Sequence, residues 1–244
     1  MTHEEVMAEF VQRMRGAGAE NLLSIVLFGS AAHGEFRPGY SDVNLLCVLG
    51  DASFSFLQKI SPVIEWWRAK RHGPVPLVMT LEEMYASAAE FSIEFIDMKQ
   101  RYRVLYGEDV LRVLEVPMHL HRFQLEYELR EKLFLLRQQL LLANNNETEL
   151  WDVMLHSLSS FTTLFRHVLL ELGEAERKHS RDAVMDLSKR LSFDDSAFLE
   201  LIDIRAKKVD RKQLRASDFA ERYTGAIERV TSAVDRMEGG IPHS

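Results

Sequence analysis

The sequence predicts an α+β protein in which a mixed sheet with helices is followed by an all-α helical bundle. Before about residue 116, short apolar runs alternate with turn residues, and after it the apolar residues recur at helical spacing. Glycine is nearly absent between residues 108 and 224, and Pro117 is the only proline there. We therefore predict two domains, residues 1–116 and residues 117–244.

The first domain is predicted to combine helices with short strands. An amphipathic helix at residues 4–15 ends at the turn signal GAGAEN, and the segment FSFLQKISPVIEWWRAK is a second helix with Pro62 near its start or at a kink. Thr80, with Glu83 three residues later, forms a capping-box pattern that opens a helix to about residue 89. The predicted strands are LLSIVLFG, VNLLCVL and VPLVMT, with one or two more in SIEFIDM and YRVLYG.

The second domain is predicted to contain helices only. The segment HRFQLEYELREKLFLLRQQLLLA is a long amphipathic helix, and a second one runs from residue 149 to Gly173, its expected C-cap. Two or three more helices follow, around residues 180–191, 195–206 and 217–237.

Composition narrows the class of protein. With 46% hydrophobic and 27% charged residues, the chain has the composition of a globular protein. Its net charge of −7 excludes an overall positive field that would attract nucleic acid. The lone Cys47 excludes an intramolecular disulfide framework. The N-terminus lacks the pattern of a signal peptide, and the apolar runs fall far short of the roughly 20 residues that span a bilayer. We expect a cytoplasmic protein with no membrane contact.

The segment LFGSAAHGEFRPGYSDVNLL, residues 27–46, holds three of the 12 glycines. Gly29 and Ser30 follow a predicted strand, so small side chains leave backbone N–H groups open to an anion. GxxxxGK[ST] and GxGxxG are both absent, which argues against a P-loop or a Rossmann dinucleotide site. Taken alone, Gly-Ser after a strand is more often an ordinary turn.

The end of the same segment strengthens the functional interpretation. Asp42 and Asn44 are two residues apart on a predicted strand, so their side chains point the same way, about 7 Å apart. Two oxygen ligands so placed can bind divalent metal over a triphosphate. A phosphate-binding turn beside a metal site is far less expected by chance than either feature alone.

The stretch FGSAAHGEFRPGYSDVNLLCVL resembles the signature of the nucleotidyltransferase superfamily related to DNA polymerase β, a Gly-Gly/Ser turn followed by two acids on a strand. It is closest in style to the minimal and aminoglycoside nucleotidyltransferases. The residues on matching positions are Gly29, Ser30, Gly34, Ser41 and Asp42. The resemblance implies a nucleotidyltransferase-like core at residues 1–116. For residues 117–244 it extends only to the general architecture of a C-terminal helical bundle.

The resemblance also implies an activity. Such enzymes transfer a nucleoside monophosphate from an NTP, here with ATP as first candidate, to an acceptor hydroxyl with Mg²⁺ or Mn²⁺. It implies that Gly29 and Ser30 grip the phosphates, with Gly34 and Ser41 in the same site, and that Asp42 is a catalytic metal ligand.

A third carboxylate of the family normally activates the acceptor hydroxyl. Glu94 and Asp97 in SIEFIDM are the candidates, and their odd spacing would put them on opposite faces of a strand. We favour Glu94 as base or third metal ligand, because an acid within an apolar strand needs a reason; the alternative is an exposed strand position.

Asn44 departs from the family pattern, which has its second acid at this position. An amide offers one neutral oxygen to Mg²⁺ and cannot act as a base. Three outcomes stay open. The enzyme works with one tightly held metal; another acid (Glu35, Glu82 or Asp97) takes over; or the chain is a regulatory or antitoxin-like module that binds nucleotide without transferring it.

Other candidate sites carry less weight. None of the nine histidines shows a zinc spacing, and Cys47 is better explained as a small core residue. His33, within the Gly-Ser loop, could contact phosphate or be solvated. The basic segment 205–215 is better explained as a solvated surface than as a site for an RNA acceptor. The acceptor is not identified, and the oligomeric state stays open, a homodimer included.

Overall fold

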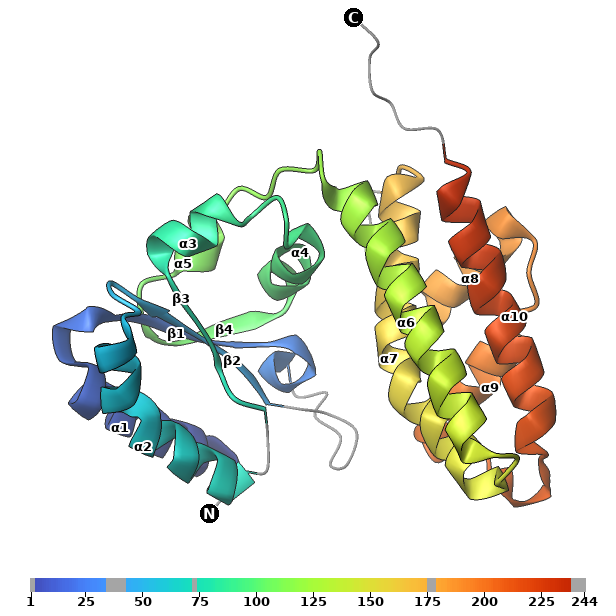
Figure 1. Cartoon of the computed structure of the whole chain (residues 1–244), viewed down its shortest axis with the longest axis horizontal. Helices are drawn as coiled ribbons and strands as arrows, with labels where there is room; N and C mark the ends of the chain where they lie inside the picture. Colours follow the sequence, from blue (N-terminus) through green and yellow to red (C-terminus); the bar gives the residue numbers. More distant parts are fainter. Residues whose placement is uncertain (1–2, 34–42, 72–73, 175–178, 238–244) are drawn as a thin grey trace, which may run out of the picture. The chain divides into compact units, whose positions relative to one another are not determined.

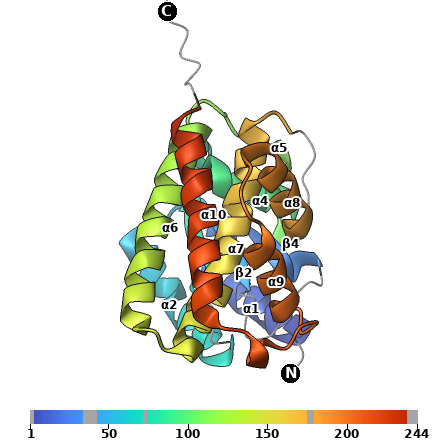
Figure 2. The ribbon, with the colours of Figure 1, turned by 90° about the vertical axis from the view of Figure 1, so that its right-hand side faces the viewer.

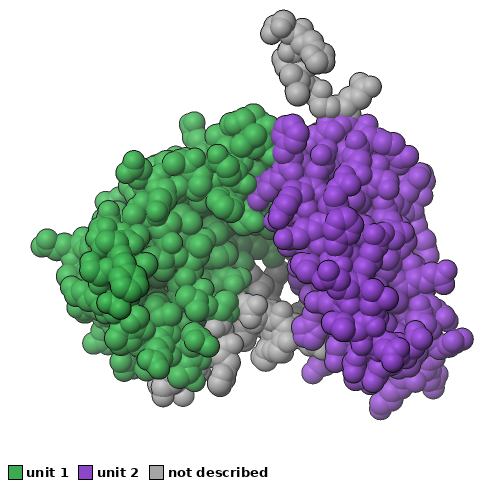
Figure 3. Space-filling view, in the orientation of Figure 1, with its two compact units in different colours: residues 1–121 green, residues 122–244 purple. Residues whose placement is uncertain are grey.

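The computed structural model describes residues 3–33, 43–71, 74–174 and 179–237. The chain divides into two compact units, Met1–His121 and Arg122–Ser244 (Figures 1 and 3). The sequence-based expectation places the domain boundary after residue 116. Each unit contains its own set of buried apolar side chains.

The first unit is built on a four-stranded mixed sheet with the strand order β3-β2-β1-β4. Strand β1 (Leu22–Phe28) pairs antiparallel with β2 (Asn44–Leu49) and with β4 (Tyr102–Gly107). Strand β2 pairs in parallel with β3 (Leu77–Thr80). The predicted mixed sheet is therefore confirmed, and β1 and β2 occupy its centre.

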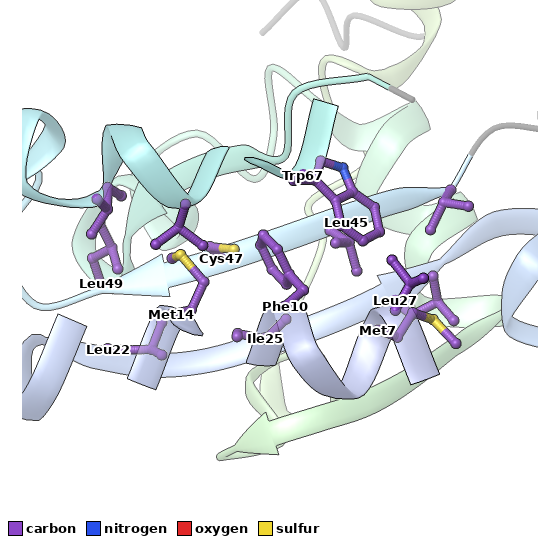
Figure 4. Close-up of a cluster of buried hydrophobic side chains, with 14 residues drawn as sticks. Met7, Phe10, Met14, Leu22, Ile25, Leu27, Leu45, Cys47, Leu49 and Trp67 are labelled. Atoms are coloured by element: carbon purple, nitrogen blue, oxygen red, sulfur yellow. The ribbon is translucent and has the colours of Figure 1, made fainter. Parts of the chain in front are cut away.

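Helices cover both faces of this sheet, which is why the central strands are apolar along their whole length. One face packs against α1 (His3–Gly18) and α2 (Phe54–Arg71). On the other face lie α3 (Leu81–Ala86), α4 (Ser92–Gln100) and α5 (Val110–Val113) (Figure 1). In the first layer, the rings of Phe10 and Trp67 lie 4.8 Å apart over Ile25 and Cys47 (Figure 4). Burial raises the pKa of the Cys47 thiol to about 12, which suits a core residue and not a nucleophile.

Two helices of the first unit differ in detail from the prediction. Helix α1 continues through the first part of GAGAEN to Gly18, because glycine and alanine do not by themselves end a helix whose apolar face remains packed. Helix α2 contains Pro62 in its interior. Proline removes the N–H that would bond the carbonyl of Gln58, and the Ser61 hydroxyl donates to that carbonyl instead, at 3.0 Å.

The segment after β3 begins as predicted and then diverges. Thr80 caps α3 (Leu81–Ala86) through a capping box, accepting from the Glu83 N–H at 3.1 Å while the Glu83 carboxylate accepts from the Thr80 N–H at 2.7 Å. The segment SIEFIDM forms helix α4 (Ser92–Gln100), so its prediction as a strand is wrong. YRVLYG forms β4 as predicted, and the short α5 (Val110–Val113) follows.

The second unit is all helical in its described residues. Its helices run alongside one another in Figures 1 and 2. They are α6 (His121–Ala143), α7 (Glu147–Glu171), α8 (Ser180–Leu191), α9 (Ser196–Arg205) and α10 (Ala216–Asp235). Gly173 follows the end of α7 with φ +87°, the left-handed conformation expected of a glycine at a helix end.

Aromatic side chains hold the second unit together. Phe198 of α9 lies between Phe165 of α7 and Tyr223 of α10, with ring centroids 4.9 Å and 4.5 Å away. These rings are fully buried, so the helices share one core. Among the helices of the described residues, none is long and apolar enough to cross a membrane.

Candidate active site

The candidate site lies where β1 ends and β2 begins. Because these strands are antiparallel, Phe28 at the end of β1 pairs with Asn44 at the start of β2. Gly29 follows directly and opens a short 3₁₀ turn, Gly29–His33, that also contains Ser30. The sheet therefore brings the Gly-Ser turn and the Asn44 position of the motif to one edge.

Gly29 has two properties that a side chain would disturb. Its φ is +78°, a left-handed conformation that costs other residues about 1–2 kcal/mol. A Cβ placed on Gly29 would lie 3.3 Å from Nδ2 of Asn44, so the amide is packed closely against the turn. The Gly29 N–H donates to the carbonyl of Arg101 at 2.9 Å, and this bond attaches the turn to the C-terminal end of α4.

Not all of the predicted site residues fall within the described ranges. Gly34, Ser41 and Asp42 lie outside them, as does the alternative acid Glu35. Within them, the structure brings Gly29 and Asn44 together, and Ser30 follows in the same turn.

Glu94 lies in a different kind of element from the one predicted. It lies in α4, where a residue three positions away falls on the same side, so the expectation that Glu94 and Asp97 point in opposite directions is wrong. Both are half-buried. Along the helix, Asp97 is about 6 Å and Glu94 about 10 Å from Arg101, the residue bonded to Gly29.

The alternative acid Glu82 lies at the wrong end of the sheet. It follows Thr80, which pairs with Leu49 at the far end of β2, about 17 Å along the strand from Asn44. Extended by two residues, the same parallel register places Val75 beside Asn44, so β3 contributes no carboxylate there. Of the candidate acids, Glu82 therefore lies away from this edge of the sheet.

A metal ion at this edge of the sheet would need oxygen ligands from nearby side chains. Within the described ranges, no group of three or more His, Cys, Asp and Glu side chains could hold a metal ion. The Asn44 amide oxygen is one hard ligand, and the sequence places the Asp42 carboxylate two residues before it. Since Mg²⁺ is commonly bound by one or two protein oxygens with phosphates and water completing its shell, this set fits one magnesium ion beside a nucleotide.

The basic segment 205–215 is partly neutralised by neighbouring acids. Arg211 lies 3.7 Å from Asp152, and Lys212 lies 3.8 Å from Asp210. These pairs agree with the solvated-surface interpretation.

Comparison with known proteins defines the class. A sequence model of the nucleotidyltransferase domain matches residues 7–133, which is more than half of the chain. The chain therefore belongs to the nucleotidyltransferase family, as its motif indicated.

A solved structure extends the similarity to the whole fold. It is spectinomycin adenyltransferase AAD(9) from Enterococcus faecialis, determined with ATP and spectinomycin. The two are 14% identical, with a TM-score of 0.56 over 93% of this chain and 100% of that one. At this identity the match shows a shared fold, including the C-terminal helices. No curated protein matches the chain.

Proposed function

We propose that this protein transfers a nucleoside monophosphate from a magnesium-bound NTP to an acceptor hydroxyl. The observation that carries the proposal is the close packing of Asn44 against Gly29, because it joins the two halves of the family motif at one edge of the sheet. ATP is the first nucleotide to test, since the adenyltransferase with the same fold was determined with ATP.

Each motif residue has a role in this proposal. Because the Gly29 N–H is already donated to Arg101, the turn Gly29–His33 binds the β- and γ-phosphates through backbone N–H groups from Ser30 onward, with Gly34 and Ser41 completing the site. Asp42 and Asn44 supply the oxygens that would hold one Mg²⁺, which when bound neutralises phosphate charge. The turn is held in place by the bond from Gly29 to Arg101.

A carboxylate of α4 is the proposed base for the acceptor hydroxyl. Glu94 is the residue that the sequence favoured, and Asp97 lies on the same side of the helix, one turn closer to the end that contacts Gly29. Glu94→Gln and Asp97→Asn separate the two, because only the base should show a loss of turnover with unchanged nucleotide affinity.

A second candidate function is nucleotide binding without transfer. The observation that favours it is the neutral amide of Asn44 where the family has an acid, since a single carboxylate holds metal cations beside a triphosphate more weakly than two do. The two candidates predict opposite effects of returning an acid to this position.

The first prediction concerns Asn44→Asp. Incubation with α-labelled ATP, Mg²⁺ or Mn²⁺ and candidate acceptors, spectinomycin first, measures transfer of the label. Under the enzyme proposal the wild type transfers label, Asp42→Ala abolishes transfer, and Asn44→Asp raises it about tenfold or more by adding one metal-bound charge. Asn145→Asp, an exposed position in the second unit, adds the same charge elsewhere and should change nothing.

The results distinguish the candidates. Nucleotide binding by the wild type without transfer, together with transfer by Asn44→Asp, contradicts the enzyme proposal and supports the binding module. Absence of NTP binding at millimolar concentration contradicts both.

A further inference from the structure

Helix α6 has two apolar faces. One contains Leu125, Leu129, Leu133 and Leu136, which are buried against the rest of the second unit. At 100° per residue, four other apolar side chains lie on the opposite side of the helix. They are Phe123, Tyr127, Phe134 and Leu141, which are 60%, 64%, 52% and 79% exposed. We call these four residues the α6 stripe.

Among the described residues of its own unit, no helix buries the α6 stripe, which is unusual for aromatic residues in such a regular pattern. The exposed parts of the four side chains of the stripe amount to about 430 Å², taking about 200 Å² per aromatic and 100 Å² per leucine side chain. Two such surfaces would bury about 860 Å², the size of a weak interface and not of an obligate one.

The spacing of the stripe is that of a coiled-coil seam. Together with Arg130 and Arg137, the stripe occupies positions 123, 127, 130, 134, 137 and 141, which alternate by four and three residues. This series of intervals reads the same in both directions. A second α6 can therefore pack antiparallel against the first with every seam position opposite another, as a twofold axis requires.

The charges favour this antiparallel pairing. Reversing the helix about residue 132 places Phe123 opposite Leu141, Arg130 opposite Phe134 and Arg137 opposite Tyr127 of the second copy. Each arginine then meets an aromatic ring, a favourable cation–π arrangement. A parallel pair would instead place Arg130 and Arg137 beside their own copies, where neither guanidinium meets a ring.

Both seam arginines form ion pairs with acidic residues of their own chain. Arg130 is paired with Asp235, and Arg137 lies 2.7 Å from Glu228, both on α10. Since each guanidinium is already paired within its own chain, two copies can approach without net positive charge in the seam.

We propose that the α6 stripe is the interface of a homodimer in which two α6 helices pack antiparallel about a twofold axis near residue 132. The proposal does not depend on the nucleotidyltransferase activity.

Sedimentation velocity of the full chain tests the proposal. At about 50 μM, well above the Kd of a modest micromolar interface, the wild type should sediment at twice the monomer mass. Phe134→Lys should shift it to the monomer, because it places a second positive charge opposite Arg130 in the centre of the seam. Phe54→Lys, at a 75% exposed position of α2, is the matched control and should leave the dimer intact. Circular dichroism of each variant checks that the helices persist.

Cysteine cross-linking tests which residues of the two α6 helices face each other, separately from how stable the dimer is. The native Cys47 is fully buried, so introduced thiols are the reactive ones. The double variant Phe123→Cys, Leu141→Cys should form an intermolecular disulfide, whereas Phe123→Cys alone should not. Three results would overturn the proposal: a monomer at all concentrations, a dimer unaffected by Phe134→Lys, or cross-linking by Phe123→Cys alone.

Discussion

Gly107 shows how one residue can be required by backbone geometry alone. It ends β4 with φ +77°, and a Cβ placed on it would lie 1.9 Å from the carbonyl oxygen of Leu23 on the neighbouring strand. No side-chain rotation relieves such a contact, because both atoms are fixed by the backbone.

We therefore expect Gly107→Ala to lower the free energy of unfolding by roughly 3 kcal/mol, from the left-handed φ and the forced displacement of β1. Urea denaturation measures the change. Gly225→Ala is the control, since this glycine lies within α10 with open space around it, and it should raise stability by about 0.5–1 kcal/mol. Equal effects of the two substitutions would contradict the argument.

The buried thiol of Cys47 predicts a dependence of stability on alkaline pH. Its pKa is raised from 9.0 to about 12 in the folded chain, so above pH 9 the folded state keeps a proton that the unfolded state loses. The free energy of unfolding then falls as pH rises, by up to about 1.4 kcal/mol per pH unit. Burial also raises the pKa of Tyr223, which acts in the same direction.

Cys47→Ala should make this fall less steep between about pH 9 and 11, although the cavity it leaves lowers stability at every pH. Denaturation curves across this pH range measure the slope. A slope identical to that of the wild type would show that the thiol does not contribute.

At the scale of single elements, helix caps were easier to predict from the sequence than whether a short segment forms a helix or a strand. The capping box of α3 depends only on Thr80 and Glu83, three residues apart, and the structure forms it as predicted. Helix α4 shows the opposite case. Its residues are buried or half-buried around almost the whole helix, so SIEFIDM has no clear helical periodicity, and its two isoleucines favour a strand.

We expect Thr80→Ala to cost about 1 kcal/mol of stability, because the first turn of α3 loses a hydrogen-bond acceptor for the Glu83 N–H. Thr80→Ser keeps the hydroxyl and should remain close to the wild type. Thermal or urea denaturation of the two variants gives the difference, and an equally large loss in the serine variant would indicate lost packing of the methyl group instead.

At the scale of the whole molecule, sequence patterns were sufficient for the class of fold. The long helices of the second unit repeat their apolar residues often enough to be located within a few residues, and the continuous apolar runs of β1 and β2 indicate a sheet covered on both faces. The motif at residues 27–46 indicated the family that the domain match then showed.

The candidate site was less predictable than the fold, for a physical reason. The closeness of Gly29 to Asn44 follows from the pairing of Phe28 with Asn44 on two adjacent antiparallel strands, which local patterns can suggest. The contact between Gly29 and Arg101 joins residues far apart in the sequence, through a backbone carbonyl that any residue could supply. No residue type marks such a contact, so only the three-dimensional structure reveals it.

The hydrogen bond from the Gly29 N–H to the Arg101 carbonyl also reduces the number of backbone N–H groups of the turn that are available to a ligand. Because the first N–H of the turn is already donated to the Arg101 carbonyl at the end of α4, a phosphate bound as proposed would find its donors from Ser30 onward. An inhibitor designed for this family on the assumption that every amide of the turn is available would count one donor too many in this protein.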